Sequence, residues 1–299
     1  MPELSIIITA KDNNDSKLKD LLMSISMQTY QDYEVLVITE GDSESAKGIG
    51  VKKAEGEFIC ILASDNYLND IKCLEKCLTV LKQNPEIIGS YPARYYYTRH
   101  DNILNRYFAL MGCNDVIPFY LGKKDRLSYD KRDIMGGGWD FVMGDWATIP
   151  TLGDNGFFIR RNILLQADID HYFHIDVCED LFRKGYKTYA LVNTTIWHKT
   201  GGNIFKFFWK RFRYADKFDV KERRWRMVNG FVDYLRLCLF VFFALTIIQP
   251  LMVSWRGYKT IKDKVWFLHP LVCLITLGVY GLWALKRVLS FVVLGGKKS

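Results

Sequence analysis

Asp65 is the residue of this chain whose position most directly suggests chemistry. It follows a short apolar run, Phe58–Leu62, and stands within the sequence Ala63-Ser64-Asp65-Asn66. Such a run predicts a buried strand, and open α/β sheets place their ligand sites at the carboxyl ends of strands. A carboxylate there can bind a divalent metal ion, and the ion can bind a diphosphate. The run therefore predicts a metal and diphosphate site at the strand end.

The segments around Asp65 alternate between strand-like and helix-like patterns. Short apolar runs predict strands, and apolar residues three or four positions apart predict helices. The expected strands are Leu4–Ile8, Tyr33–Ile38, Phe58–Leu62, Ile87–Tyr91, Phe157–Ile159, Tyr186–Val192 and Ile196–His198, and the expected helices are Lys17–Met27 (capped by Asp15 or Ser16), Gly48–Ala54 and Ile71–Leu81. The alternation predicts an α/β fold with a mostly parallel, doubly wound sheet. For residues 92–150 we expect loops and short helices over the active face.

Charge divides the chain into an acidic part and a basic, apolar part. The formal charge is +8, but residues 199–236 hold 11 Lys/Arg against 4 Asp/Glu, and residues 237–299 hold 8 against 1. The preceding residues are therefore net acidic. Basic charge beside long apolar runs favours an anionic membrane surface over nucleic acid as a partner. The 7 cysteines form no CxxC pair, which favours reduced thiols in a cytosolic setting. The chain opens on an expected strand, so we expect no cleavable signal peptide.

The basic, apolar part contains two kinds of segment. Residues 203–225 mix aromatic and basic residues, which is typical of a helix lying in the headgroup layer of a membrane. Leu237–Trp255 and Val265–Leu285 are long apolar stretches that could each cross a bilayer as a helix. We favour a hairpin that crosses. The alternative is a pair of broken helices that enters and returns, with which Pro250 and Pro270 are compatible.

Four short motifs follow one another in the first 200 residues. They are Ser5–Asp12, Ser24–Tyr30, Tyr33–Ser45 and Ala54–Ile59. In these motifs the chain resembles the family 2 glycosyltransferases, which have the GT-A fold. The tail resembles members that act on polyprenyl-linked acceptors, and Gly153–Arg161 looks like the acceptor-side turn and strand of that group. The resemblance implies a GT-A domain at 1–202, an amphipathic interfacial segment at 203–230 and a transmembrane helical hairpin at 231–292.

The resemblance also implies an activity. It is inverting transfer of a hexose from a nucleotide-sugar donor to a polyprenyl-phosphate or polyprenyl-diphosphate-linked glycan, at the cytoplasmic face of the cell membrane. The alternative is a non-catalytic GT-A-like membrane module that binds sugar nucleotides or scaffolds a glycan-assembly complex. The sequence leaves open the sugar, the nucleotide and whether the chain forms a homo-oligomer.

The metal ligands that the resemblance implies are incomplete here. Family members commonly carry Leu-Asp-x-Asp-Asp where this chain has Leu62–Asn66, so the first acid is replaced by Ala63 and Asp65 alone remains. This departure favours the non-catalytic alternative. We expect Asp65 and His198 to hold Mg²⁺ or Mn²⁺ together. The alternatives are a helix N-cap for Asp65 and an ordinary strand-end histidine for His198.

Transfer to a hydroxyl also needs a base, and two carboxylates are candidates. Asp176 and Glu179 have the spacing of a capping box, so we expect Asp176 to be the N-cap of a helix and to point into the cleft. Asp176 is the first candidate and Asp180 the second. The alternative for Asp176 is a role in capping alone.

The remaining site residues are expected to bind the two substrates. Those expected near the nucleotide are Thr9, Ala10, Lys11, Thr39, Glu40 and Ser64 with Asp65. Thr39 stands where the family commonly has an Asp. Lys47 and Arg94 are candidate diphosphate contacts, with solvated surface as the alternative. Four basic residues either attract the acceptor phosphate or anchor the chain to anionic lipid: Lys206, Lys210, Arg211 and Arg213.

Overall fold

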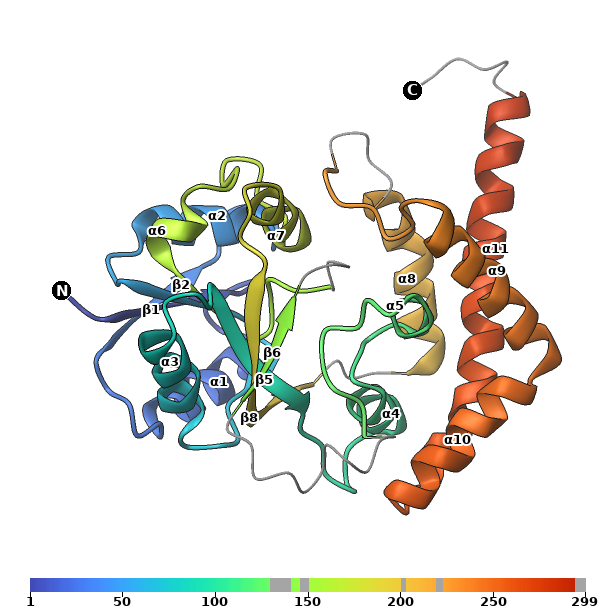
Figure 1. Ribbon diagram of the computed structural model, residues 1–299, viewed down its shortest axis with the longest axis horizontal. Coiled ribbons are helices and arrows are strands. Elements are labelled where there is room, and N and C mark those ends of the chain that lie inside the picture. Colours follow the sequence, from blue (N-terminus) through green and yellow to red (C-terminus); the bar gives the residue numbers. More distant parts are fainter. Residues whose placement is uncertain (130–140, 146–150, 200–202, 219–222, 294–299) are drawn as a thin grey trace.

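The computed structural model describes residues 1–129, 141–145, 151–199, 203–218 and 223–293. Its centre is an 8-stranded sheet in the order β2-β1-β3-β7-β5-β8-β4, with β6 paired to β8 (Figure 1). The strands are β1 (Leu4–Thr9), β2 (Tyr33–Ile38), β3 (Phe58–Ala63), β4 (Asn66–Tyr67), β5 (Gly89–Tyr95), β6 (Phe141–Asp145), β7 (Phe157–Arg160) and β8 (Thr188–His198).

The sheet is mixed, which corrects the expectation of a mostly parallel one. Parallel pairs join β1 to β2, β1 to β3 and β5 to β8. β7 runs antiparallel to both β3 and β5, and β4 and β6 run antiparallel to β8. Because β7 reverses between two forward strands, β1, β2, β3, β5 and β8 still point the same way. Their carboxyl ends therefore share one edge of the sheet.

Helices cover both faces of the sheet, as a doubly wound arrangement requires (Figure 1). One apolar core packs α1 (Ser16–Ser26) and α3 (Cys73–Gln83) against one face. A second core packs α2 (Ser45–Lys53), α6 (Arg161–Leu164) and α7 (His174–Arg183) against the other. The expected cap of α1 is confirmed, since the Asp15 carboxylate accepts a hydrogen bond from the Lys17 N–H.

The helices in the 92–150 segment belong to a third core. α4 (Ile103–Met111) and α5 (Val116–Leu121) are short, as expected. Their apolar residues pack with the tail helices, so they connect the sheet domain to the tail. Residues 130–140 and 146–150 of this segment lie outside the described residues, and its place over the active face stays a prediction.

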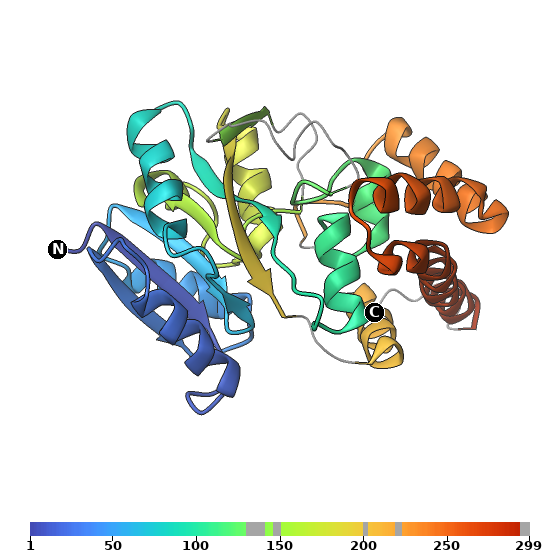
Figure 2. The same ribbon diagram turned by 90° about the horizontal axis from the view of Figure 1, so that it is seen from below.

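The tail forms a helical layer on the side of the molecule away from β1 and β2 (Figure 2). It consists of α8 (Ile204–Phe218), α9 (Phe231–Thr246), α10 (Ile248–Thr260), a 3₁₀ turn η2 (Lys264–Leu268) and α11 (His269–Val293). Lys264–Ser290 is the one described helical segment that is long and apolar enough by itself to cross a membrane.

The Leu237–Trp255 stretch is bent rather than one straight helix. The chain breaks at Ile247, which has a left-handed backbone with φ 63°, and α9 and α10 meet at 84°. Pro250 lies in the first turn of α10 and has no N–H to donate to the Thr246 carbonyl, so a continuous helix is disfavoured there. Together the two helices form a bent pair, which is compatible with a broken span that crosses and with a pair that enters and returns.

Candidate functional site

The carboxyl ends of three parallel strands lie side by side. In the sheet register Thr9 is opposite both Ile38 of β2 and Ala63 of β3. The Ala10 N–H donates to the Ile38 carbonyl at 3.1 Å, and the Ser64 N–H donates to the Thr9 carbonyl at 3.1 Å. The residues expected to bind nucleotide therefore follow neighbouring strand ends.

Their exposure differs along this edge. Lys11, Thr39 and Glu40 are exposed, and Thr9 is buried at 7% exposure. The Ser64 hydroxyl donates to the Asp15 carboxylate at 3.2 Å. The exposed residues at this edge can therefore contact a ligand, whereas Thr9 is buried within the sheet.

Asp65 and His198, expected to act together, are brought together by the fold. β4 pairs antiparallel with the end of β8 and places Asn66 opposite His198. The Asp65 Oδ1 atom lies 3.5 Å from His198 Nε2, and the Lys199 N–H donates to the Asp65 carbonyl at 2.9 Å. A short two-stranded pairing therefore sets the distance between residues 133 positions apart.

The electrostatic surroundings keep the Asp65 carboxylate ionised. Burial alone would raise its pKa, but the charge of His198 and its hydrogen bond, with Lys17 and Lys210 nearby, hold the pKa below its usual value. Lys210 belongs to α8, so the basic tail contributes positive potential to this site. A carboxylate that is ionised and partly exposed is ready to bind a cation.

The Asp65–His198 pair fits a divalent metal ion. A separation of 3.5 Å lets one oxygen and one nitrogen contact the same ion, whose ligand distances are about 2.0–2.2 Å. Two protein ligands leave the other positions for phosphate oxygens and water.

Asn114 contacts the His198 ring, and sequence reasoning missed this residue. Its amide lies 3.0 Å from His198 Nδ1. The atom that faces the ring is Asn114 Nδ2, so as placed the amide donates to Nδ1 and the ring proton is on Nε2, toward Asp65. Turning the amide over would let its oxygen accept from Nδ1 and free Nε2 as a metal ligand. Arg211 of α8 fixes the loop by donating to the Asn114 carbonyl at 2.8 Å.

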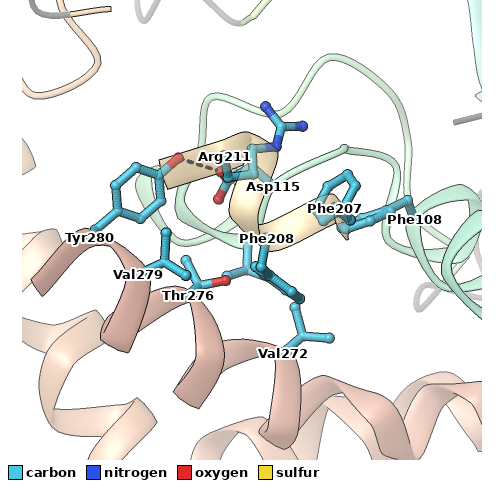
Figure 3. Close-up of a pocket in the computed structure, with 10 residues that line it drawn as sticks. Phe108, Asp115, Phe207, Phe208, Arg211, Val272, Thr276, Val279 and Tyr280 are labelled. Atoms are coloured by element: carbon cyan, nitrogen blue, oxygen red, sulfur yellow. Dashed lines mark hydrogen bonds between the residues drawn. The ribbon is translucent and has the colours of Figure 1, made fainter. Parts of the chain in front are cut away.

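The residue after Asn114 connects this loop to α11. Asp115 caps α5, accepting from the Ile117 N–H at 2.9 Å, and its other oxygen accepts from the Tyr280 hydroxyl at 2.7 Å (Figure 3). Phe207 and Phe208 of α8 fill the space between α4 and α11 in the same view. The tail helices therefore hold the loop that positions His198.

A second charged cluster lies around Lys47. Its ammonium donates to Glu44 at 3.0 Å and to Asp154 at 2.9 Å, and its side chain is 1% exposed. The solvated-surface alternative for Lys47 is therefore wrong, and its charge is already neutralised by two carboxylates. His174 contacts Glu44 through Nδ1 at 3.0 Å and donates its backbone N–H to Glu44 at 2.9 Å.

This cluster resembles a metal site in its ligand set. The ligand atoms of Glu44, Asp154 and His174 lie within 4.8 Å of one another. Lys47, however, bonds both carboxylates and supplies the positive charge that a metal ion would bring. Although burial opposes it, the charges of His174 and Lys47 lower the pKa of Glu44, and those of Asp154 and Glu44 raise the pKa of Lys47. We therefore regard this cluster as an internal ion-pair network, and a divalent ion at Asp65 and His198 stays a prediction.

The two clusters are joined through the turn before β7. The Asn155 N–H donates to the Asp154 carboxylate at 2.8 Å, and Asn155 Oδ1 accepts from Asn66 Nδ2 at 3.0 Å. Asn66 Oδ1 in turn accepts from the Ala63 N–H at 2.9 Å. Asn155 has φ 56°, a left-handed conformation that asparagine tolerates better than most residues. A continuous polar path thus links Lys47 to the end of β3.

Asp176 does not cap a helix, which corrects the capping-box prediction. α7 begins at His174 with Phe173 as its N-cap, and Glu44 supplies the oxygen that accepts the His174 N–H. Asp176 lies in the first turn, 2% exposed, and accepts from Arg223 Nε and from the N–H groups of Arg224 and Trp225. The carboxylate thereby anchors the segment that leads into α9.

Asp180 is also paired, one turn further along α7. It forms an ion pair with Arg224, whose Nε lies 2.7 Å from Oδ1, and it accepts a hydrogen bond from the Asp168 N–H at 3.0 Å. A role as base for either Asp176 or Asp180 stays a prediction, and it requires the arginine to release an oxygen. Arg94 is buried rather than solvated, with its guanidinium 5.3 Å from the centre of the Tyr129 ring.

Comparison with known proteins gives structural likenesses but no sequence match. No protein-family model matches the chain, and no curated protein sequence matches it. The chain is similar to a solved mannosyltransferase from Pyrobaculum calidifontis in complex with GDP-Man and Mn²⁺. The likeness has a TM-score of 0.46 and 11% sequence identity, and covers 95% of this chain and 88% of that one.

Proposed function

We propose that this protein is a membrane-attached, metal-dependent inverting glycosyltransferase. It transfers a sugar from a nucleotide-sugar donor to a polyprenyl-phosphate or polyprenyl-diphosphate-linked acceptor at the cytoplasmic membrane face. The observation that carries the proposal is the Asp65–His198 pair at the shared carboxyl edge, with atoms 3.5 Å apart. Such an edge is where open α/β sheets bind nucleotides.

The proposed donor lies across the ends of β1, β2 and β3. Its nucleoside contacts the residues that follow these strands, and its diphosphate reaches Asp65 and His198. A divalent ion bound by this pair would neutralise charge on the leaving nucleoside diphosphate. Asp65 and His198 hold the diphosphate end in place, and Asn114 keeps the histidine ring oriented.

The proposed acceptor comes from the tail side. α8 presents exposed Lys206 and Lys210, and Lys210 is close enough to act on the Asp65 carboxylate. A cationic helix beside the site favours approach of an anionic lipid phosphate. Exposed apolar residues on α9, α10 and α11, among them Phe242, Trp255 and Leu282, favour a membrane beside this helix.

A transfer assay tests the proposal. Purified protein in detergent is incubated with labelled nucleotide sugars, polyprenyl phosphate and Mn²⁺ or Mg²⁺, and label in extracted lipid is counted. We expect metal-dependent transfer that Asp65→Asn lowers at least about a hundredfold, because removing a preorganised electrostatic group costs that much. Asp32→Asn is the matched control, since this exposed residue precedes β2 at the opposite edge. Equal activity in both variants would exclude the assigned site.

A second candidate is a non-catalytic module that binds sugar nucleotides at the same edge. Ala63 at the missing ligand position favours it, as do the arginine contacts that engage both candidate bases. The two candidates differ in one result. A module would show metal-dependent nucleotide-sugar binding by calorimetry while none of the donors yields labelled lipid.

A further inference from the structure

A cavity of about 510 Å³ lies between α4 and the connection from α10 to α11. Its volume is within the usual range for sites that bind small molecules. None of its lining residues belongs to the strand-end site. One part of the lining is cationic and the other is apolar. Together they favour a ligand that carries both an anionic group and an apolar group.

The cationic part of the lining has more positive charges than carboxylates to neutralise them. It consists of Arg99, Arg106, Lys262 and Lys264, with Asp263 as the one lining carboxylate. Arg106 binds Asp263 through both Nε and Nη2, at 3.2 and 2.5 Å, so these two charges neutralise each other. Arg99, Lys262 and Lys264 are exposed at the rim. Three cations around one opening favour a phosphate group.

The apolar part of the lining continues into an exposed apolar surface along α11. Ile103 is 52% exposed and Phe267 is 44% exposed, although both are large and apolar. Beyond the cavity, Leu271 and Leu274 extend the exposed apolar surface along α11. Inorganic phosphate has no group that would cover these side chains. An acyl chain would cover them and gain the free energy of apolar burial.

The position of the cavity also matches the boundary of a bilayer. It lies at the start of Lys264–Ser290, the described segment long and apolar enough to span a membrane. Trp255 and Tyr258 of α10 stand beside it, with the Lys259 and Lys262 ammonium groups over their rings at 5.3 and 4.7 Å. Aromatic and basic residues in this combination are typical of the headgroup level.

We propose that this cavity is a binding site for the headgroup of an anionic phospholipid, separate from the sugar-transfer site. Arg99, Lys262 and Lys264 bind the phosphate, and Ile103, Phe267 and Leu268 contact the first part of an acyl chain. The Arg106–Asp263 ion pair holds α4 against the connection and so keeps the cavity open. The inference rests on the membrane attachment proposed above and needs no transfer reaction.

The test is binding of a short-chain lipid to the full chain in non-ionic detergent. Dihexanoyl-phosphatidylglycerol is titrated below its critical micelle concentration and binding is followed by calorimetry. The probes for comparison are dihexanoyl-phosphatidylcholine and inorganic phosphate. We expect phosphatidylglycerol to bind and Arg99→Gln/Lys264→Gln to weaken its affinity by about thirtyfold, since each cation near a lipid surface contributes about a fivefold effect.

The matched control is Lys52→Gln/Lys53→Gln, which removes the same charge from exposed positions on α2. We expect it to bind phosphatidylglycerol like the wild type. Unchanged thermal unfolding without lipid shows that Arg99→Gln/Lys264→Gln is folded. Equal weakening by the control would overturn the site, because net charge would then explain binding. Equal binding of phosphatidylcholine or inorganic phosphate, or absence of binding, would also overturn it, whether or not sugar transfer occurs.

Discussion

Replacing Lys47 by Met tests whether the cluster around it is an ion-pair network that holds the sheet domain together. The ammonium is 1% exposed and bonds two carboxylates from segments more than 100 residues apart. Met preserves most of the buried length of the side chain, so the substitution removes mainly the charge. Glu44 and Asp154 would then face each other without the cation between them.

The size of the effect follows from the burial of the three groups. Breaking a fully buried ion pair costs about 3–5 kcal/mol, whereas an exposed pair contributes about 0.2–1 kcal/mol. Glu44 and Asp154 are 19% and 20% exposed, so water screens part of the loss. We expect the free energy of unfolding to fall by about 3 kcal/mol, which lowers the melting temperature by roughly 10 °C.

The assay is thermal and urea unfolding in one detergent at pH 7, followed by circular dichroism. Lys52→Met on the same helix is the matched control, because Lys52 is 53% exposed and pairs with an exposed Asp170. We expect a loss below about 1 kcal/mol for the control. A Lys47→Met loss no larger than the control's would refute the view that the cluster is a buried network.

The same variant tests the competition between lysine and metal. Without the ammonium, Glu44, Asp154 and His174 can offer ligand atoms within 4.8 Å of one another to a cation. We expect millimolar Mn²⁺ to raise the melting temperature of Lys47→Met more than that of the wild type. An equal rise in both proteins would show that Mn²⁺ binds elsewhere and that the Lys47 ammonium does not compete with a metal ion at this cluster.

Three further predictions concern pH, metal affinity and the tail. The Glu44 pKa is held below its ordinary value of 4.5, so its contribution to stability is present above pH 4.5 and is lost as pH falls below it; the wild type should lose melting temperature there more steeply than Glu44→Gln. Asn114→Ala should weaken Mn²⁺ binding in calorimetry by about 10–100-fold, and unchanged affinity would remove its role in orienting His198. Asp176→Ala should lower the free energy of unfolding by about 3–5 kcal/mol in urea, because Arg223 is left buried without its partner. If Asp176→Asn instead keeps the wild-type stability but abolishes transfer, the residue acts as the base.

Local pattern was enough to predict the frame of the sheet domain. The Tyr33–Ile38 strand was predicted at the residues where the structure has it, and the observed cap Asp15 is one of the two residues predicted for that role. Strands and capped helix starts depend on neighbouring residues, so their signal is present in a short window of sequence. The reversal of β7 was not predicted, because the direction in which a strand enters a sheet depends on its neighbours in space.

The prediction for Asp176 shows where local pattern fails. The capping-box spacing favoured it as a helix start, but Glu44, 130 residues before His174, accepts the N–H at the helix end. Once the carboxylate of the residue before α2 satisfies that group, the local cap is unnecessary. Asp176 is then available to bind Arg223.

The sequence by itself determined that Asp65 follows a buried strand and that a basic, apolar tail follows the sheet domain. The tertiary structure alone decided what surrounds Asp65. The β4–β8 pairing places His198 3.5 Å away, and the α5 loop adds Asn114, held by Arg211. The physical reason is that a strand end is encoded by its own apolar run, whereas the partners of a buried charge come from distant segments that meet only when the sheet and tail have packed together.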